Sequence, residues 1–461
     1  MHGAKTPLRI LFVIRAVEQL PYYESIIGSL AGRGHELRLL FDKRWSKDQS
    51  HEELNELQKR FPSLEWAWAM RQKQSIARNI LFFTRELLTY RQYLRLHKEG
   101  ESRYYDRWAG YLPKSVQRLM KYAFVKRILK SELSGAVLRI CERIIRPDHA
   151  ASKAIREYRP DVVIAGPANL RFSSADLEYL KAAVRLNLPT AVPVLSWDNL
   201  TTKGLIHIKP DILLAWNNIQ AGEAQSVHGI AKESIRVVGA AFFDRWFDTK
   251  RTPRERVEFC RDHGLSLANP ILLYLGSSVT VAPNEVWLIK KLRRALDEAS
   301  NPVLKRVQLI VRPHPANAAH YKDVESNSIV LIPRGGHHPA RKDALELFAD
   351  TLEHSMGVVG INTSGMIDAL IADKPVIALM VDEYRSTQSV ARHFQHVLES
   401  GALEKAEGVN ACVSAIGKLL KGLDAHQQER QKFVREFVRP RGLSVSAGDA
   451  AAEEIIKLCQ S

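Results

Sequence analysis

The sequence predicts an α/β protein built from parallel β-sheets, and three observations support this prediction. Short, β-branched apolar runs without alternation recur along the chain, as is typical of strands covered on both faces. Segments with helical spacing separate these runs, so the chain consists of repeated strand–helix units. Clusters of polar residues directly follow several runs, at the end of a parallel strand where open α/β sheets bind ligands.

The first half of the chain contains one such series of strands and helices. Its opening strand–helix–strand unit lacks a GxGxxG sequence, so it is not a dinucleotide-binding fingerprint. The expected strands are Leu8–Ile14, Glu36–Phe41, Val162–Ala165, Thr190–Leu195, Ile212–Ala215 and Ile235–Val238, and the expected helices lie at 20–31, 150–158, 174–187 and 219–228.

A second series follows, and the chain of 461 residues is long enough for two domains. We predict a first domain at residues 1–245 and a second at 246–461 that includes the C-terminal helices. The expected strands of the second domain are Ile271–Leu275, Val307–Val311, Ile329–Ile332, Val358–Ile361 and Val376–Leu379, and its last helices lie near 386–399, 409–422 and 426–437.

A helical insertion at about 70–146 interrupts the first series. Residues 71–150 hold 18 Lys and Arg against 7 Asp and Glu, a net +11 out of +16 for the chain. Three interpretations remain open for this segment: an ordinary solvated helix pair, a surface that sits on anionic lipid, and a nucleic-acid surface. No nucleic-acid motif accompanies the charge, so we predict no nucleic-acid partner.

Composition favours a cytoplasmic protein. The four cysteines are scattered without a CxxC pair, which indicates reduced thiols rather than disulfides or a zinc site. No apolar run reaches the roughly 18 residues that a membrane span needs. The N-terminal apolar run has the length of a strand and no small-residue cleavage site follows it.

Polar residues after the strands of the second domain form one candidate binding site. They are Gly276, Ser277 and Ser278; Arg312 and His314; Arg334, His337 and His338; and Thr363, Ser364 and Gly365, with Asp368 one turn further on. A Thr–Ser–Gly turn at a helix start offers N–H groups to an anion such as phosphate. The alternatives are that Thr363 and Ser364 only cap a helix, that Arg312 pairs with a structural carboxylate, and that His314 braces its own loop.

The first domain supplies candidates for a general base. Asp198 follows a strand and lies beside Asn199 and Lys203, and Glu18 lies in the loop after the first strand. Either carboxylate could accept a proton from a substrate hydroxyl, although Asp198 could instead form an Asx turn. The chain contains no DxD, HExxH or Walker A sequence, so we predict neither a metal nor another cofactor.

The second-half motifs resemble those of GT-B glycosyltransferases, and especially the bacterial surface-polysaccharide branch of CDP-glycerol glycerophosphotransferases and capsule Kdo transferases. The resemblance rests on the His314–Pro315 pair, the Thr363–Ser364 turn, Asp368, and Lys374–Pro375 before a strand. It implies two Rossmann-like domains that face a cleft, and a ribose contact at Asp368. A His-containing cluster of the glycerophosphotransferases is replaced here by residues 196–201, with Asp198 in place of the histidine.

This resemblance implies a metal-independent glycosyltransferase that moves a sugar, or a glycerol-phosphate-like group, from a nucleotide-activated donor. The acceptor would be a hydroxyl of a cell-surface glycan or a lipid-linked molecule, and the enzyme could sit peripherally on the inner face of the cell membrane. The alternatives are a UDP-N-acetylglucosamine 2-epimerase-like enzyme and a non-catalytic nucleotide-sugar-binding relative, because the fold alone does not decide the reaction.

Overall fold

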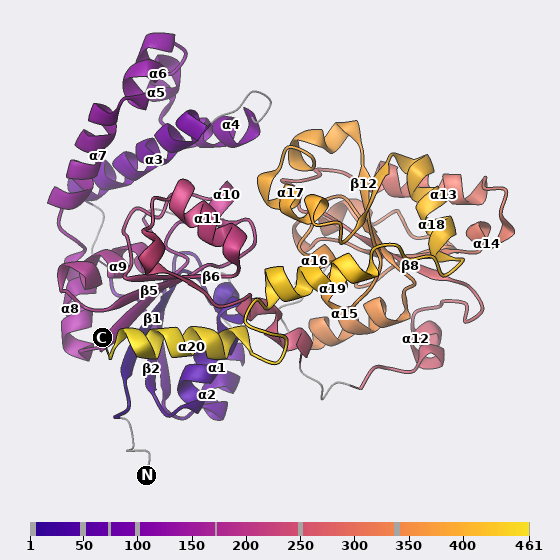
Figure 1. Cartoon of the computed structure of the whole chain (residues 1–461), viewed down its shortest axis with the longest axis horizontal. Coiled ribbons are helices and arrows are strands. Elements are labelled where there is room, and N and C mark those ends of the chain that lie inside the picture. The colour runs from indigo at the N-terminus through magenta and orange to yellow at the C-terminus, as the bar shows by residue number, and fades with distance from the viewer. Residues whose placement is uncertain are drawn as a thin grey trace. The chain divides into compact units, whose positions relative to one another are not determined.

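The structure is a computed structural model that describes residues 6–46, 52–71, 75–96, 102–170, 173–247, 252–335 and 342–460. The chain divides into two compact units (Figure 1). Unit 1 comprises Met1–Asp244 together with Phe437–Ser461, and unit 2 comprises Arg245–Glu436.

Unit 1 is built on a seven-stranded sheet in which every described pair of neighbours is parallel, in the order β3-β2-β1-β4-β5-β6-β7. The interior strand β1 is buried on both faces, because Ile10, Phe12 and Ile14 face one core cluster while Leu11 and Val13 face another. The strands are β1 (Arg9–Ile14), β2 (Glu36–Phe41), β3 (Leu64–Trp68), β4 (Val162–Gly166), β5 (Thr190–Pro193), β6 (Ile212–Ala215) and β7 (Ile235–Val237).

Helices cover both faces of this sheet, as a sheet without a polar face requires. They are α1 (Glu24–Gly32), α2 (Glu52–Arg60), α8 (His149–Tyr158), α9 (Ala175–Arg185), α10 (Asn199–Thr202), α11 (Asn218–Ser226) and α20 (Ala447–Leu458), with 3-10 segments η1 (Val17–Tyr22), η2 (Lys232–Ser234) and η3 (Ala241–Phe247), the last of which runs into unit 2.

The insertion forms the helices α3 (Ile76–Leu96), α4 (Ser102–Tyr111), α5 (Lys114–Leu119), α6 (Ala123–Lys130) and α7 (Glu132–Ile144). A buried ion-pair network fastens it to α9. The Arg85 guanidinium donates to both oxygens of Glu142, at 2.8 and 2.9 Å, and to Glu178 at 2.8 Å. Lys181 adds a bond of 2.8 Å to Glu142. Arg85 therefore joins α3, α7 and α9.

The C-terminal segment corrects the predicted division at residue 245, because Phe437–Ser461 belongs to unit 1 rather than to the second domain. Helix α20 packs along α1 (Figure 1). Gly448 makes this approach possible, since a Cβ there would lie 2.2 Å from the Ser25 hydroxyl. The Asp244 carboxylate accepts hydrogen bonds from the backbone N–H groups of Ala447 and Gly448.

Unit 2 repeats the same plan with six parallel strands in the order β10-β9-β8-β11-β12-β13. They are β8 (Ile271–Leu275), β9 (Gln308–Arg312), β10 (Ile329–Leu331), β11 (Val358–Gly360), β12 (Val376–Met380) and β13 (Glu404–Glu407). The helices are α12 (Arg256–Asp262), α13 (Val286–Asp297), α14 (Pro302–Lys305), α15 (Lys342–His354), α16 (Gly365–Ile371), α17 (Arg392–Glu399), α18 (Val409–Leu419) and α19 (Gln427–Phe433), with 3-10 segments η4 (Pro315–Tyr321) and η5 (Asp382–Thr387); a π-helical turn, η6 (Val434–Val438), follows α19.

The predicted fold class is confirmed, with two Rossmann-like parallel sheets and a helical insertion in the first. In both sheets the first strand of the unit lies between its second and fourth, which is the doubly wound order 3-2-1-4-5-6. Two edge strands, β3 and β13, were not predicted.

The ion-pair network yields a stability prediction. Replacing Arg85 with Met should lower the free energy of unfolding by about 3–5 kcal/mol, because two buried carboxylates lose a charged partner. Arg95→Met on the same helix is the matched control. Arg95 pairs with Glu132 at an exposed position, so its loss should cost less than about 1 kcal/mol. Denaturant unfolding followed by circular dichroism measures both, and equal effects would contradict the assignment.

Candidate functional site

The candidate site of unit 2 lies where the strand order reverses. The chain leaves β8 toward β9 on one side, and β11 lies on the other side of β8. The carboxyl ends of strands diverge at such a switch point and leave room for a ligand. Three of the predicted turns follow β8, β9 and β11, so the structure brings together residues 276–278, 312–314 and 363–365.

Gly276 allows the turns after β8 and β9 to touch. Its N–H donates to the Arg312 carbonyl at 2.9 Å. A Cβ at this position would lie 2.7 Å from the Tyr321 hydroxyl, 3.0 Å from that carbonyl and 3.1 Å from the His314 nitrogen. The close approach therefore requires glycine at residue 276.

The buried carboxylate of Glu285 fixes the turn after β8, and sequence analysis did not identify it. This carboxylate accepts hydrogen bonds from the Ser277 N–H, from Tyr274 at 2.9 Å and from Tyr321 at 2.7 Å. Burial raises the pKa of Glu285, while the three hydrogen bonds oppose that shift. Ser277 is fully buried in this arrangement, so only Ser278 of the predicted pair is partly exposed.

His314 is partly exposed and caps η4, because its Nδ1 accepts the N–H of Ala316 at 3.1 Å. A ring nitrogen that accepts cannot carry the proton of a neutral imidazole, so Nε2 carries it. Burial lowers the pKa of His314, which favours the neutral form at pH 7. His314 thus braces its own loop, as one alternative predicted, and still has an Nε2–H donor.

We call the edge formed by the turns after β8, β9 and β11 the rim of unit 2. Arg312 lies beneath this rim and is not exposed on it. Its guanidinium is buried, stacks on Phe348 at 4.4 Å from the ring centroid, and is attracted electrostatically by Asp368. Burial lowers the pKa of Arg312 to about 10, so it stays protonated at neutral pH. Because the guanidinium is buried, it would stabilise an anion at the rim through its electrostatic potential and not through direct contact.

Asp368 differs from the predicted ribose contact because it is buried. Its Oδ1 accepts from the Trp246 indole at 2.5 Å and pairs with Arg245 at 3.6 Å. Burial raises the pKa of Asp368, although Arg245, Trp246 and Arg312 favour its charged form. A carboxylate that is 1% exposed does not meet a ribose from solvent, so we assign Asp368 a positioning role.

The turn after β11 presents the accessible hydroxyls. Ser364 is exposed and its side chain makes no capping hydrogen bond. Thr363 is partly buried, and its hydroxyl accepts only a long bond of 3.4 Å from the Gly365 N–H. Because α16 spans seven residues, hydroxyls and backbone N–H groups contribute more here than a helix dipole.

Of the remaining predicted contacts of unit 2, the structure describes Arg334 alone. Arg334 follows the edge strand β10, is exposed, and pairs with Glu325 at 3.1 Å. His337 and His338 lie outside the described residues.

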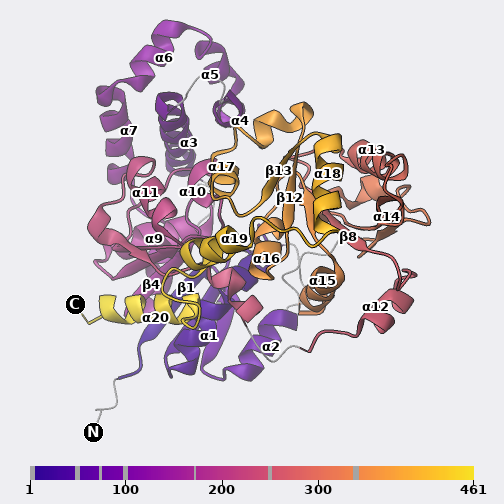
Figure 2. The same cartoon turned by 45° about the vertical axis from the view of Figure 1, so that its right-hand side comes forward.

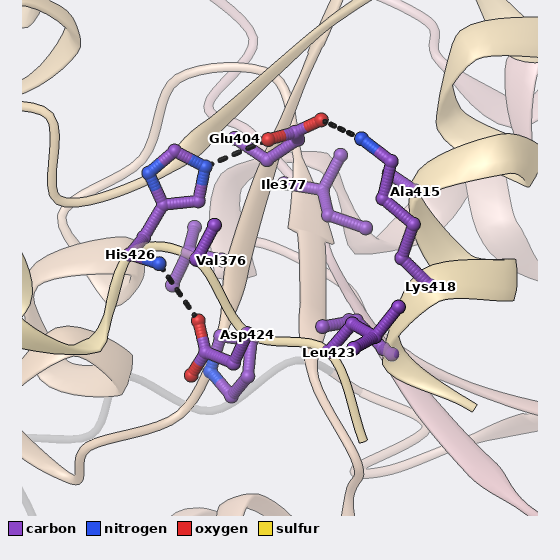
Figure 3. Close-up of a pocket in the computed structure, with 11 residues that line it drawn as sticks. Val376, Ile377, Glu404, Ala415, Lys418, Leu423, Asp424 and His426 are labelled. Carbon is purple, nitrogen blue, oxygen red and sulfur yellow. Dashed lines mark hydrogen bonds and ion pairs between the residues drawn. The ribbon is translucent and has the colours of Figure 1, made fainter. Parts of the chain in front are cut away.

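A cavity of about 230 Å³ in unit 2 is separate from the candidate site (Figure 3). Its wall includes Val376 and Ile377 at the start of β12. The cavity therefore lies at the amino ends of the parallel strands, whereas the candidate site lies at their carboxyl ends. Glu404 accepts from His426 at 2.7 Å and from Lys418 at 3.2 Å there. These polar groups satisfy one another, which indicates a structural cluster.

In unit 1, the loop after β5 holds Asp198 in a dense set of hydrogen bonds. Its carboxylate accepts from Ser196 at 2.6 Å and from Thr202 at 2.8 Å, and it pairs with Lys203 at 2.9 Å. All of these partners lie within residues 196–203, so the carboxylate is bonded within its own turn. This geometry favours the predicted alternative in which Asp198 orders its own turn.

Asn199 and Lys203 also help to hold the loop after β5 in place. Asn199 is buried and exchanges side-chain and backbone hydrogen bonds with Asn169, which follows β4. The Tyr93 hydroxyl of α3 lies 2.9 and 2.6 Å from the carbonyl oxygens of Thr201 and Lys203. The insertion therefore supports the loop that follows β5.

Two carboxyl groups lie at the switch point between β1 and β4. Glu18 is exposed in the first turn of η1, directly after β1. Asp176 accepts the N–H of Ala168 at 2.8 Å, and burial raises its pKa to about 6. Asp176 is fully buried, so Glu18 is the carboxylate of this pair that can meet a substrate.

Together these residues define what the edge of unit 2 can do. It offers a neutral imidazole N–H, exposed hydroxyls and a buried cation behind them, which suits a ligand with phosphate oxygens. Within the part of the chain that the structure describes, no three His, Cys, Asp or Glu side chains are arranged to hold a metal ion.

Comparison with known proteins shows the fold. No model of a protein family matches the chain, and no curated protein matches it in sequence. Among solved structures, a glycosyltransferase from Rickettsia africae ESF-5 is similar with a TM-score of 0.54 at 13% identity, over 98% of this chain and 100% of that one.

Two further structures are epimerases. The UDP-GlcNAc 2-epimerase from Methanocaldococcus jannaschii has a TM-score of 0.53 at 14% identity, over 98% of this chain and 100% of that one. The UDP-GlcNAc 2-epimerase from Neisseria meningitidis bound to UDP-GlcNAc has a TM-score of 0.51 at 10% identity, over 98% and 99%. At these identities the likeness establishes the GT-B type of fold, with two Rossmann-like domains.

The crowding at Gly276 predicts the effect of a single methyl group. Gly276→Ala should lower the free energy of unfolding by about 1–3 kcal/mol, because two of the three nearest atoms belong to the backbone. Gly417→Ala in α18 has no atom within 4 Å of the new Cβ, so it should be neutral or stabilise by up to about 1 kcal/mol. Denaturant unfolding compares the two. A neutral Gly276→Ala would show that the turns are not in contact.

Proposed function

We propose that this protein is a glycosyltransferase that moves a sugar, or a glycerol-phosphate-like group, from a nucleotide-activated donor to a hydroxyl of a cell-surface glycan or lipid-linked acceptor. The observation that carries the proposal is the rim of unit 2, where the turns after β9, β8 and β11 meet at the switch point. The GT-B fold adds support, because glycosyltransferases are among the structures that share it.

The rim would bind the phosphates of the donor. The Nε2–H of His314 and the hydroxyls of Thr363, Ser364 and Ser278 would donate hydrogen bonds to phosphate oxygens. Arg312 would stabilise the same charge from below. Asp368 and Glu285 would hold the cation and the turn in place rather than touch the donor.

Transfer of a sugar would break the bond between its carbon and the phosphate oxygen of the donor, and transfer of a glycerol-phosphate-like group would break the bond between its phosphorus and the bridging oxygen. In both cases the electron pair leaves on an oxygen of the nucleotide. Donors aimed at that oxygen stabilise the negative charge as it develops. The acceptor oxygen forms the new bond and gives its proton to a general base. Glu18 is the exposed candidate, and Asp198 is the candidate that is already hydrogen-bonded.

A 2-epimerase is the second candidate function, and the epimerases among the similar structures favour it. It would use the same donor rim without a separate acceptor. A relative that binds nucleotide sugars without turnover would also keep the rim.

The test is a turnover assay with a panel of nucleotide sugars, with and without a lipid-linked or polysaccharide acceptor fraction. We expect nucleotide release that depends on the acceptor. An epimerised sugar nucleotide formed without acceptor would identify the second function, and binding without either product would identify a non-catalytic relative.

Variants of the two candidate bases should separate their roles. Glu18→Gln should slow transfer by about 10²–10⁴-fold, the usual contribution of general base catalysis, while donor affinity stays within a few-fold. Asp198→Asn should slow transfer less and reduce thermal stability more, because it weakens the turn around Lys203. The reverse order would identify Asp198 as the base.

A further inference from the structure

The insertion of unit 1 carries an exposed apolar surface. We define the basic apolar surface as the exposed face of α5, α6 and α7, within residues 114–146. Figure 2 shows α5 and α6 at the end of the insertion that is farthest from the sheet of unit 1. The large apolar side chains of the basic apolar surface, each between 49% and 77% exposed, are Leu119, Tyr122, Phe124, Ile128, Leu133, Val137, Ile140 and Ile144.

Helix α7 exposes its apolar face, whereas an ordinary surface helix buries it. Leu133, Val137, Ile140 and Ile144 recur at spacings of four, three and four residues, so they share one face, and that face is exposed. A surface helix of a globular protein places its apolar stripe toward the core. The apolar stripe of α7 is thus not buried in the core of unit 1.

Polar packing holds α7 in this orientation. On its inner side, Glu142 bonds with Arg85 and Lys181. Gly135 lies against Arg91, since a Cβ there would be 2.6 Å from the Arg91 guanidinium carbon. Because Glu142 and Gly135 face inward, the aliphatic stripe on the opposite side of α7 faces outward.

Helix α6 repeats the exposed apolar pattern with cations beside it. Phe124 and Ile128 are four residues apart and both are more than 60% exposed. Lys121, Arg127 and Lys130 are exposed on the same short segment. This combination is typical of helices that lie in a membrane interface.

The charge of the surface is predominantly positive. Residues 114–146, all of them described, contain nine Lys and Arg and two Glu. Of the two acids, Glu142 is buried against Arg85 and Lys181, and Glu132 pairs with Arg95. The cations are Lys114, Arg118, Lys121, Lys126, Arg127, Lys130, Arg139, Arg143 and Arg146.

We propose that the basic apolar surface docks on an anionic phospholipid bilayer, with its cations on the headgroups and its apolar side chains inserted at the acyl boundary. Charge complementarity selects an anionic partner. The aliphatic stripe of α7 selects a bilayer over nucleic acid, whose affinity comes mainly from phosphate contacts and needs no exposed Leu, Ile and Val. Helices with an apolar face flanked by Lys and Arg lie in the plane of the membrane interface. No described helix is long and apolar enough to cross a membrane.

This docking is independent of the proposed function, since it uses residues remote in sequence from the donor rim and is tested without turnover. Should both hold, docking would bring the enzyme to the bilayer that carries a lipid-linked acceptor.

The test is flotation of the full chain with vesicles of phosphatidylcholine alone and with 30 mol% phosphatidylglycerol, on the order of one anionic lipid in three as in acidic membranes. We expect binding to the anionic vesicles that weakens as salt rises. The triple variant Lys121→Glu, Arg127→Glu, Lys130→Glu should bind at least roughly tenfold more weakly, and so should Phe124→Ser with Ile128→Ser.

Matched controls lie in unit 2. Lys290→Glu, Lys305→Glu, Lys421→Glu changes the net charge equally at exposed positions, and Val257→Ser with Leu267→Ser removes exposed apolar side chains. Both controls should bind vesicles like the unaltered chain. Circular dichroism and thermal unfolding establish that every variant is folded.

Three results would overturn the proposal. One is the absence of flotation with anionic vesicles at low salt. Another is equal loss of binding in the unit 2 controls, which would show that net charge alone acts. The third is self-association, seen as a doubled mass in sedimentation, that the Phe124→Ser, Ile128→Ser variant abolishes while vesicle binding is absent, since a second copy would then cover this surface.

Discussion

The candidate site depends on one buried carboxylate, that of Glu285. It accepts three hydrogen bonds, from the Ser277 N–H and from the hydroxyls of Tyr274 and Tyr321, and so ties β8, the turn after it, η4 and α13 together. The Tyr321 hydroxyl is also the atom that crowds Gly276. Unpaired, such a carboxylate would be costly to bury. With its partners it sets the spacing between the turn and the His314 loop.

A second polar network has the corresponding role in unit 1. Arg85 and its carboxylate partners fasten α3 and α7 to α9, and Tyr93 of α3 reaches the loop after β5. Inward-facing charge leaves the aliphatic side of α7 exposed. The same ion pairs that place the insertion therefore also produce its exposed apolar surface.

Much of the sheet architecture could be predicted from the sequence, because buried parallel strands leave continuous apolar runs. The runs at Ile271–Leu275 and Ile212–Ala215 match β8 and β6 residue for residue. The edge strand β13 reads Glu–Lys–Ala–Glu and buries only its alanine fully, so it leaves no such signal. The position of Phe437–Ser461 depends on contacts with Asp244 and Ser25, about 200 and 420 residues away in sequence, which local patterns do not encode.

The sequence predicted where the candidate site residues lie relative to the strands, but not which of their side chains are exposed. The apolar runs predicted that Gly276, His314 and Ser364 follow strands, and these residues come after β8, β9 and β11. The runs did not distinguish exposed from buried side chains, as Asp368 shows. Helix α16 is apolar around most of its circumference, a sign of a fully buried helix that also applied to its aspartate. Glu285 was missed because its partners, Tyr274 and Tyr321, lie 11 and 36 residues away.

Nucleotide binding at the rim of unit 2 can be measured by isothermal titration of the full chain with UDP, CDP, CMP, GDP and ADP. His314→Ala and His314→Gln would be titrated in parallel, since the Gln amide can still donate a hydrogen bond. We expect that one nucleotide binds, that His314→Ala loses most of this affinity and that His314→Gln keeps part of it. Binding of no nucleotide, or equal binding by all three proteins, would overturn the assignment of the site.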